Sequence, residues 1–156
     1  MCVVAESSSA LRPMRFPVLS FSYDGLVYAL DSLEPITQCT KLGFKDGFYR
    51  GLLLVDSERF SYRVLDARRV RTLPQRRFGD LLELLTGNPR WQVEFIFEPG
   101  ASPISLEDVK SLIASSFKKQ AGYWEEMTDL ESFRDQVMRA SSMEEVLAAF
   151  KGANLM

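Results

Sequence analysis

Histidine is absent from this sequence of 156 residues, and its only cysteines are Cys2 and Cys39. The lack of histidine removes the commonest general base near neutral pH, every Ser-His or Cys-His nucleophile pair and the commonest zinc ligand. Two cysteines alone do not supply the usual ligands of a structural zinc site. We therefore expect no bound metal, and we expect Cys39 to be a buried, inert thiol.

Other absences narrow the class of protein. No apolar run reaches the roughly 20 residues of a membrane-spanning helix, so no membrane insertion is expected. No glycine-rich phosphate loop occurs, which disfavours a nucleotide-binding doubly wound fold, and we expect no cofactor. Residues 1–13 lack a basic start and an apolar stretch, so they are interpreted as a flexible tail and not an export signal. The scarcity of cysteine favours a reduced, cytoplasmic location.

The composition is that of one globular domain. Hydrophobic residues make up 46% of the chain and charged residues 26%, and eleven phenylalanines provide bulky core material. The length suits a single domain with a core of its own, which we place at residues 14–152.

The first half of the domain has the patterns of strands. Residues 19–23 and 26–30 alternate around Asp24-Gly25, a pair typical of a two-residue type I′ hairpin turn. That turn predicts a register in which Tyr23 faces Leu26. One buried face would then contain Leu19, Phe21, Tyr23, Leu26, Tyr28 and Leu30.

Further strands and a helix follow. The apolar run at residues 49–55 predicts a strand buried on both faces. An alternating strand opens at Phe60 and ends before Pro74. Residues 78–85 have helical spacing, and residues 91–97 alternate as a half-buried strand.

The rest of the chain has helical spacing throughout. Ser105, Thr128 and Ser142 each precede an acidic residue by three positions, a pattern typical of a capping box at a helix start. We therefore predict an α+β fold. It has an antiparallel sheet of about five strands, mostly N-terminal, with helices packed on one face and an all-helical C-terminal part.

Arginine is concentrated in residues 59–77, which contain seven arginines and one aspartate. The candidate anion-binding residues within this stretch are Arg63, Arg68, Arg69 and Arg71. A solvated outer strand face that shields a sheet edge is the first interpretation, and pairing with the chain's own acids is the second. Because the sequence pI is near 5.3, binding to nucleic acid is disfavoured.

Acidic residues are concentrated in residues 123–145, which have a local charge of −5. The solvent face of two amphipathic helices explains much of this pattern. A docking surface for a basic partner is the alternative, with an aromatic anchor among the acids. The candidate partner-binding residues are Trp124, Glu125, Glu126, Asp129, Glu131 and Asp135.

Short segments at residues 44–51, 53–57, 123–126, 129–131 and 140–146 carry a resemblance. They are similar to segments of small bacterial immunity proteins of polymorphic toxin systems, and the general layout matches as well. The resemblance implies a non-enzymatic protein that binds and neutralises a cognate toxin, and it implies no catalytic residues.

Three hypotheses follow for the function. The first is a protein-binding protein, most concretely an immunity protein that neutralises a basic toxin domain through its acidic helices. The second is a module that binds nucleic acid or another polyanion through residues 59–77. The third, ranked last, is an enzyme that uses carboxylates alone, through an acid pair that the fold brings together. The adjacent acids at residues 107–108 and 144–145 are interpreted as capping features of first helical turns.

Overall fold

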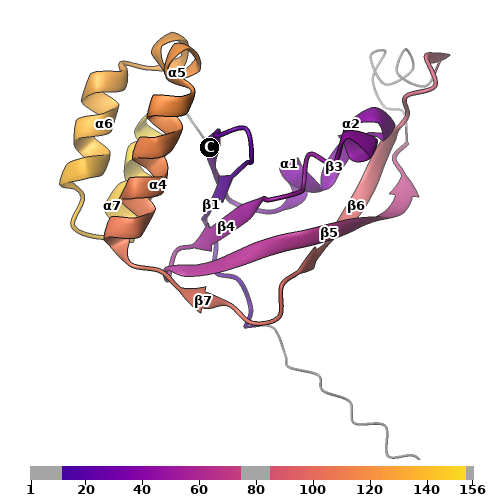
Figure 1. The fold of residues 1–156 in the computed structure, drawn as a ribbon, viewed down its shortest axis with the longest axis horizontal. Coiled ribbons are helices and arrows are strands. Elements are labelled where there is room, and N and C mark those ends of the chain that lie inside the picture. The colour runs from indigo at the N-terminus through magenta and orange to yellow at the C-terminus, as the bar shows by residue number, and fades with distance from the viewer. Residues whose placement is uncertain (1–11, 75–84, 154–156) are drawn as a thin grey trace, which may run out of the picture.

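The computed structural model describes residues 12–74 and 85–153. Within them the chain has an α+β fold, as predicted, and every strand pair is antiparallel (Figure 1). The strand order is β2-β1-β4-β5-β6-β3, and β7 pairs with β5. The strands are β1 (Val18–Phe21), β2 (Val27–Leu30), β3 (Gln38–Thr40), β4 (Leu53–Asp56), β5 (Phe60–Thr72), β6 (Arg90–Phe97) and β7 (Ser102–Pro103).

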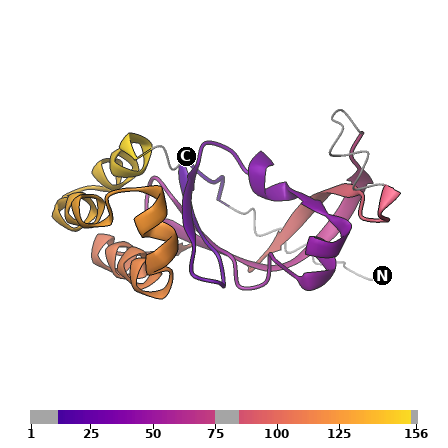
Figure 2. The same ribbon diagram turned by 90° about the horizontal axis from the view of Figure 1, so that it is seen from above.

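The helices lie at two ends of the molecule. The C-terminal helices gather at one end of the curled sheet, whereas the short helices α1 and α2 lie toward the other end (Figure 2). The C-terminal part of the described chain is all helical, as predicted. The helices are α1 (Glu34–Thr37), α2 (Lys41–Asp46), α4 (Leu106–Lys119), α5 (Ala121–Met127), α6 (Leu130–Arg139) and α7 (Met143–Gly152).

Two hydrophobic cores lie on opposite faces of β4. Successive side chains of a strand point to opposite faces, so Val55 joins the core beneath α4–α7 whereas Leu54 joins the core inside the curl of the sheet. Both side chains are fully buried. The prediction of a strand buried on both faces is therefore confirmed, although β4 itself begins only at Leu53.

The β1–β2 hairpin forms, but the predicted register is wrong by one residue. Ser22 and Leu26 close a loop of three residues: the Ser22 N–H donates to the Leu26 carbonyl (3.0 Å), and the Leu26 N–H donates to Ser22 Oγ (3.2 Å). Gly25 takes the positive φ of 93° that such a loop needs at its last position. Tyr23 is consequently in the loop and 63% exposed, not in the core.

The shifted register also changes which side chains share a face. Leu19 now pairs with Ala29 and Phe21 with Val27, and these four side chains belong to the core beneath the helices. Ser20 on the opposite face is only 2% exposed. It is buried because β1 is a central strand between β2 and β4, with protein on both faces.

The two long strands agree with their predictions. β5 runs from Phe60 to Thr72, just before Pro74, and β6 buries Val93 and Phe95 while Glu94 is exposed. The structure adds irregularities of register between β5 and β6, at residues 64–66 and 69–71. The predicted helix over residues 78–85 falls almost entirely outside the described residues.

The helix caps were predicted correctly at two of three positions. Ser105 Oγ accepts a hydrogen bond from the Asp108 N–H (3.0 Å), and Ser142 Oγ accepts one from the Glu145 N–H (3.2 Å). Thr128 does not cap a helix, which corrects the third prediction. It ends α5, and the next residue, Asp129, caps α6 instead.

A buried carboxylate ties the start of the described chain to the β4–β5 turn. Asp56 is fully buried and accepts hydrogen bonds from the backbone N–H groups of Arg15, Glu58 and Phe60 at 2.9–3.2 Å. It also pairs with the Arg12 guanidinium at 3.0 Å. The Arg12 charge and the three N–H donors offset the cost of removing the Asp56 carboxylate from water.

Candidate functional site

The acidic residues predicted to bind a partner lie on α5 and α6 and at the corner between these helices. We call Glu125, Glu126, Asp129, Glu131 and Asp135 the acidic face. All five residues are exposed.

The sequence builds this corner through the end of one helix and the cap of the next. Thr128 is extended (φ −158°, ψ 168°) and ends α5. Asp129 Oδ1 accepts a hydrogen bond from the Ser132 N–H (3.3 Å) and so begins α6. α6 then buries Phe133 and Val137 at a helical spacing of four, which leaves its acidic side toward solvent.

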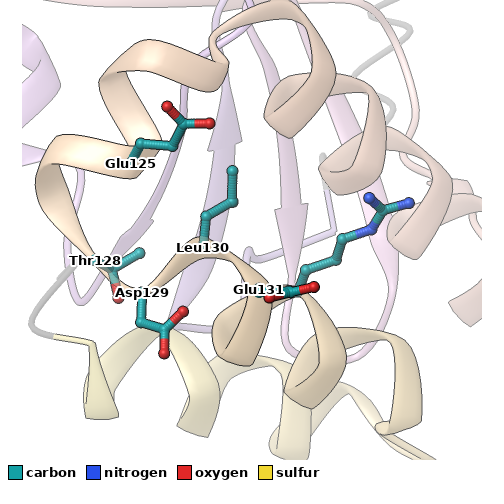
Figure 3. Close-up of a pocket in the computed structure, with 6 residues that line it drawn as sticks. Glu125, Thr128, Asp129, Leu130 and Glu131 are labelled. Carbon is teal, nitrogen blue, oxygen red and sulfur yellow. The ribbon is translucent and has the colours of Figure 1, made fainter.

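Two neighbouring clefts open on the acidic face. The first has a volume of about 460 Å³, and the second, of about 430 Å³, continues along α6 and shares Asp129 and Glu131 with the first. Leu130 lines the first cleft and also packs against the helical core, so an apolar side chain lies among acids (Figure 3). The lining residues of the first cleft are Glu125, Thr128, Asp129, Leu130, Glu131 and Arg134.

Much of the negative charge in this region is not neutralised within the chain. Asp135 forms an exposed ion pair with Arg139 one helical turn away (3.4 Å). No hydrogen bond or ion pair joins the side-chain carboxylate of Glu125, Glu126 or Glu131 to any other residue in the part of the chain that the structure describes. Their carboxylates are thus available to an external cation.

Trp124 is not part of this surface, which corrects the prediction that it anchors a partner. Its side chain is 0% exposed, and its ring packs edge-on against Phe117 with ring centroids 5.3 Å apart. The indole Nε1–H donates to the buried Ser116 Oγ (3.3 Å). We therefore assign Trp124 to the core.

Met127 is an exposed apolar residue beside the acidic face that the sequence interpretation missed. It lies three positions after Trp124, and this spacing would place it with the core on a longer helix. Because α5 ends at Met127, the side chain is 50% exposed. The sequence pattern does not show that α5 ends at Met127, so it does not predict that this side chain is exposed.

Two arginines of β5 pair with acids in β6 or directly after it, not with the acidic face. Arg68 and Glu94 face each other across the two strands and form an ion pair at 2.6 Å. Arg63 and Glu98 form a longer one at 3.7 Å. Both pairs are exposed, so each contributes little to stability. The second interpretation of the cluster, pairing with the chain's own acids, thus holds for these two arginines.

Arg69 and Arg71 differ from each other. The Arg69 guanidinium lies over the Trp91 ring at 4.7 Å, and it also donates to Thr72 Oγ1 (2.7 Å). Arg71 is exposed and pairs with Gln92 through the backbone, but no hydrogen bond, ion pair or ring contact joins its guanidinium to another described residue. The four candidate anion-binding arginines therefore do not form one open patch.

The Cys39 thiol and the acids in the first turns of α4 and α7 lie in environments that favour a structural role over catalysis. Burial is the main effect on the Cys39 thiol and raises its pKa, which opposes formation of a reactive thiolate. Asp108 and Glu145 lie in the first turns of α4 and α7, and Glu145 accepts hydrogen bonds from the N–H and Oγ of Ser141. No group of metal-binding side chains is present among residues 12–74 and 85–153.

Comparisons with models of protein families, with curated proteins and with solved structures gave no match to this chain. In the described residues no helix combines the length and the apolar character needed to cross a membrane.

Proposed function

We propose that this is a non-enzymatic protein-binding domain whose acidic face docks onto a basic surface of another protein. The supporting observation is the cleft at the α5–α6 corner, where Leu130 lies among Glu125, Asp129 and Glu131. Protein interfaces commonly combine an apolar centre with a polar rim, and this cleft has that composition. The resemblance to immunity proteins gives the proposal its most concrete form, the neutralisation of a basic toxin domain.

Electrostatics would act mainly on the speed of association. Complementary charge steers two proteins together, and the effect weakens as salt screens the charges. The free carboxylates of Glu125, Glu126 and Glu131 are suited to this role, because no bond within the described chain has to break first. Met127 and Leu130 would then supply the apolar contact that slows dissociation.

The polyanion-binding alternative has less support. Arg63 and Arg68 already contact carboxylates of the same chain, and Arg69 is stacked on an aromatic ring. A polyanion would have to compete with each of these contacts. Among the four candidate arginines, Arg71 alone offers an unengaged guanidinium to a ligand.

The test compares two double charge reversals. Glu125→Lys with Glu131→Lys changes the acidic face, whereas Asp31→Lys with Asp46→Lys makes the same change in net charge on exposed residues outside it. The probe is a candidate partner, chosen as a basic toxin domain whose gene neighbours that of this chain. Association and dissociation rates are measured at several salt concentrations, and circular dichroism verifies the fold.

We expect the acidic-face variant to associate at least about tenfold more slowly at low salt and to lose most of its salt dependence. The control variant should keep the association rate within about a factor of two. Equal effects of the two variants would show that only net charge matters. Unchanged binding by the acidic-face variant would contradict the proposal and show that this face is only a solvated helix surface.

A further inference from the structure

One edge of the C-terminal half of β5 is not covered by any strand in the described parts of the chain. β4 pairs with β5 only as far as Arg63, and the Val64 N–H then donates to the Leu52 carbonyl on that side (2.9 Å). β6 follows the opposite edge as far as Thr72. In Figure 1 this part of β5 extends beyond the end of β4. We call residues 65–72 on the uncovered side the free edge.

The free edge is accessible along most of its length. Residues 68–72 are all exposed, and so are the large apolar side chains of Leu65 (52%) and Val70 (57%). Exposed apolar side chains along an uncovered strand make this edge unlike an ordinary charged surface. They offer a bound segment two apolar contacts.

The chemistry of a strand edge selects a peptide over a nucleic acid. An uncovered edge presents backbone N–H donors and C=O acceptors in alternation. Another extended peptide chain satisfies both kinds of group, whereas a phosphate backbone offers acceptors only. Strand addition is the established way in which such an edge binds a peptide.

The charges along the edge select an acidic peptide. Arg68 and Arg71 are exposed there, and Arg69 lies between them, so residues 65–72 carry three cations against the single acid Asp66. A second copy of β5 paired antiparallel to the first would bring arginines close to arginines, and like charges across strands are destabilising. Arg68 contacts Glu94 on the β6 side, but a guanidinium has five N–H donors and can pair with a second carboxylate on its other side.

We propose that the free edge binds an extended, acidic segment of another protein by strand addition. The irregularities at residues 64–66 and 69–71 limit the regular part of the edge to about four residues, so we infer a short segment. Carboxylates of this segment pair with Arg68 and Arg71, and apolar side chains contact Leu65 and Val70. This site does not depend on the acidic face, because the α5–α6 corner lies at the other end of the molecule (Figure 1).

The test uses a peptide of about eight residues that alternates glutamate with valine, which is long enough to span the free edge. Three probes serve as controls: the same peptide with alternate amides N-methylated, a peptide with lysine for glutamate, and an oligonucleotide of equal charge. Binding to the full chain is followed by fluorescence anisotropy. Changes at the backbone amides of residues 65–72 are followed by nuclear magnetic resonance.

Two pairs of substitutions locate the site. Arg68→Glu with Arg71→Glu should weaken binding of the acidic peptide by about tenfold or more. Lys45→Glu with Lys118→Glu makes the same change in net charge on exposed residues of α2 and α4 and should leave binding unchanged. The acidic-face variant should also bind the peptide normally, which separates this proposal from the proposed function.

Several results would overturn the proposal. N-methylation separates hydrogen bonding from charge, so equal binding of the methylated and unmodified peptides excludes strand addition. An oligonucleotide that binds as tightly as the acidic peptide indicates a general polyanion surface. The absence of shifts at residues 65–72 with millimolar peptide excludes the free edge as the site.

Discussion

Replacement of Trp124 is the most direct test of the revised assignment of this residue. The side chain is fully buried, and its ring lies 5.3 Å from those of Phe117 and Tyr123 and 6.1 Å from that of Phe133. Its indole N–H bonds to Ser116 Oγ. Trp→Ala substitutions in cores typically cost about 3–5 kcal/mol, because a cavity adds to the lost transfer free energy. The total free energy of unfolding of a natural domain is only about 5–15 kcal/mol, so a loss of this size is a large part of it.

The free energy of unfolding of Trp124→Ala should therefore fall by about 3–5 kcal/mol. Trp124→Phe keeps an aromatic ring and should lose about 1–2 kcal/mol, from the smaller volume and the missing N–H bond. Tyr23→Ala is the matched control: this aromatic residue is 63% exposed, and its loss should change stability by less than about 0.5 kcal/mol.

Urea unfolding, followed by far-ultraviolet circular dichroism, measures all three variants. A change in the midpoint with a constant slope reports stability alone. If Trp124→Ala lost less than about 1 kcal/mol while Tyr23→Ala lost more, the packing described for α5 and the hairpin loop would be wrong. Trp124 would then return to the candidate interface.

Two further predictions concern polar groups that are fully buried, as in Asp56, or partly buried, as in Tyr28. Asp56→Ala should lower the free energy of unfolding by about 3–5 kcal/mol, because the Arg12 charge and three backbone N–H groups lose their acceptor; a loss below about 1 kcal/mol would contradict this. For Tyr28, burial first and then the hydrogen bond with Tyr123 raise the pKa, so folding favours the neutral phenol. The contribution of Tyr28 to the free energy of unfolding is fully present below the pKa of about 10 that it has in the unfolded chain. This contribution is lost as the pH rises toward the higher pKa of the folded state. Thermal unfolding between about pH 9 and pH 11 should show a smaller alkaline loss in Tyr28→Phe, and equal losses would contradict the assignment.

Local patterns were sufficient where neighbouring residues alone decide the structure. The alternation after Phe60 predicts β5, and the alternation of residues 91–97 predicts β6. The caps at Ser105 and Ser142 could also be predicted from the sequence, because an N-cap hydrogen bond joins residues three positions apart. Each of these signals is contained within a short stretch of chain.

Patterns failed where one side chain selects between similar local structures. Asp24-Gly25 is typical of a two-residue turn, but Ser22 Oγ bonds across the loop and favours a loop of three residues. Thr128 and Asp129 are both good N-caps, and only the path of the chain at the corner decides that Asp129 takes the role. The short elements α1 and β3 were missed because residues 31–42 have no clear period.

The candidate site was predictable in its charges but not in its aromatic residue. Carboxylates are almost always exposed in a folded protein, so the acidic face followed from composition and helical period. Trp124 was ambiguous because α5 has only seven residues, too few for the apolar period to fix which side faces the core. Its burial depends on Phe117 and Phe133, which come from α4 and α6.

The path of the chain decides which of the two charged regions has the stronger unbalanced charge. Residues 1–77 carry a formal charge of +4 and residues 78–156 one of −6, which by itself suggests two ends of opposite sign. β6 belongs to the acidic half but lies beside β5, where Glu94 and Glu98 pair with arginines. Charge at the sheet end is thereby partly neutralised, whereas most carboxylates of the acidic face have no ion-pair partner among the described residues. If both proposals hold, a basic partner approaching from a distance would be steered to the helical end, and the free edge of β5 would act only on segments that come close to it.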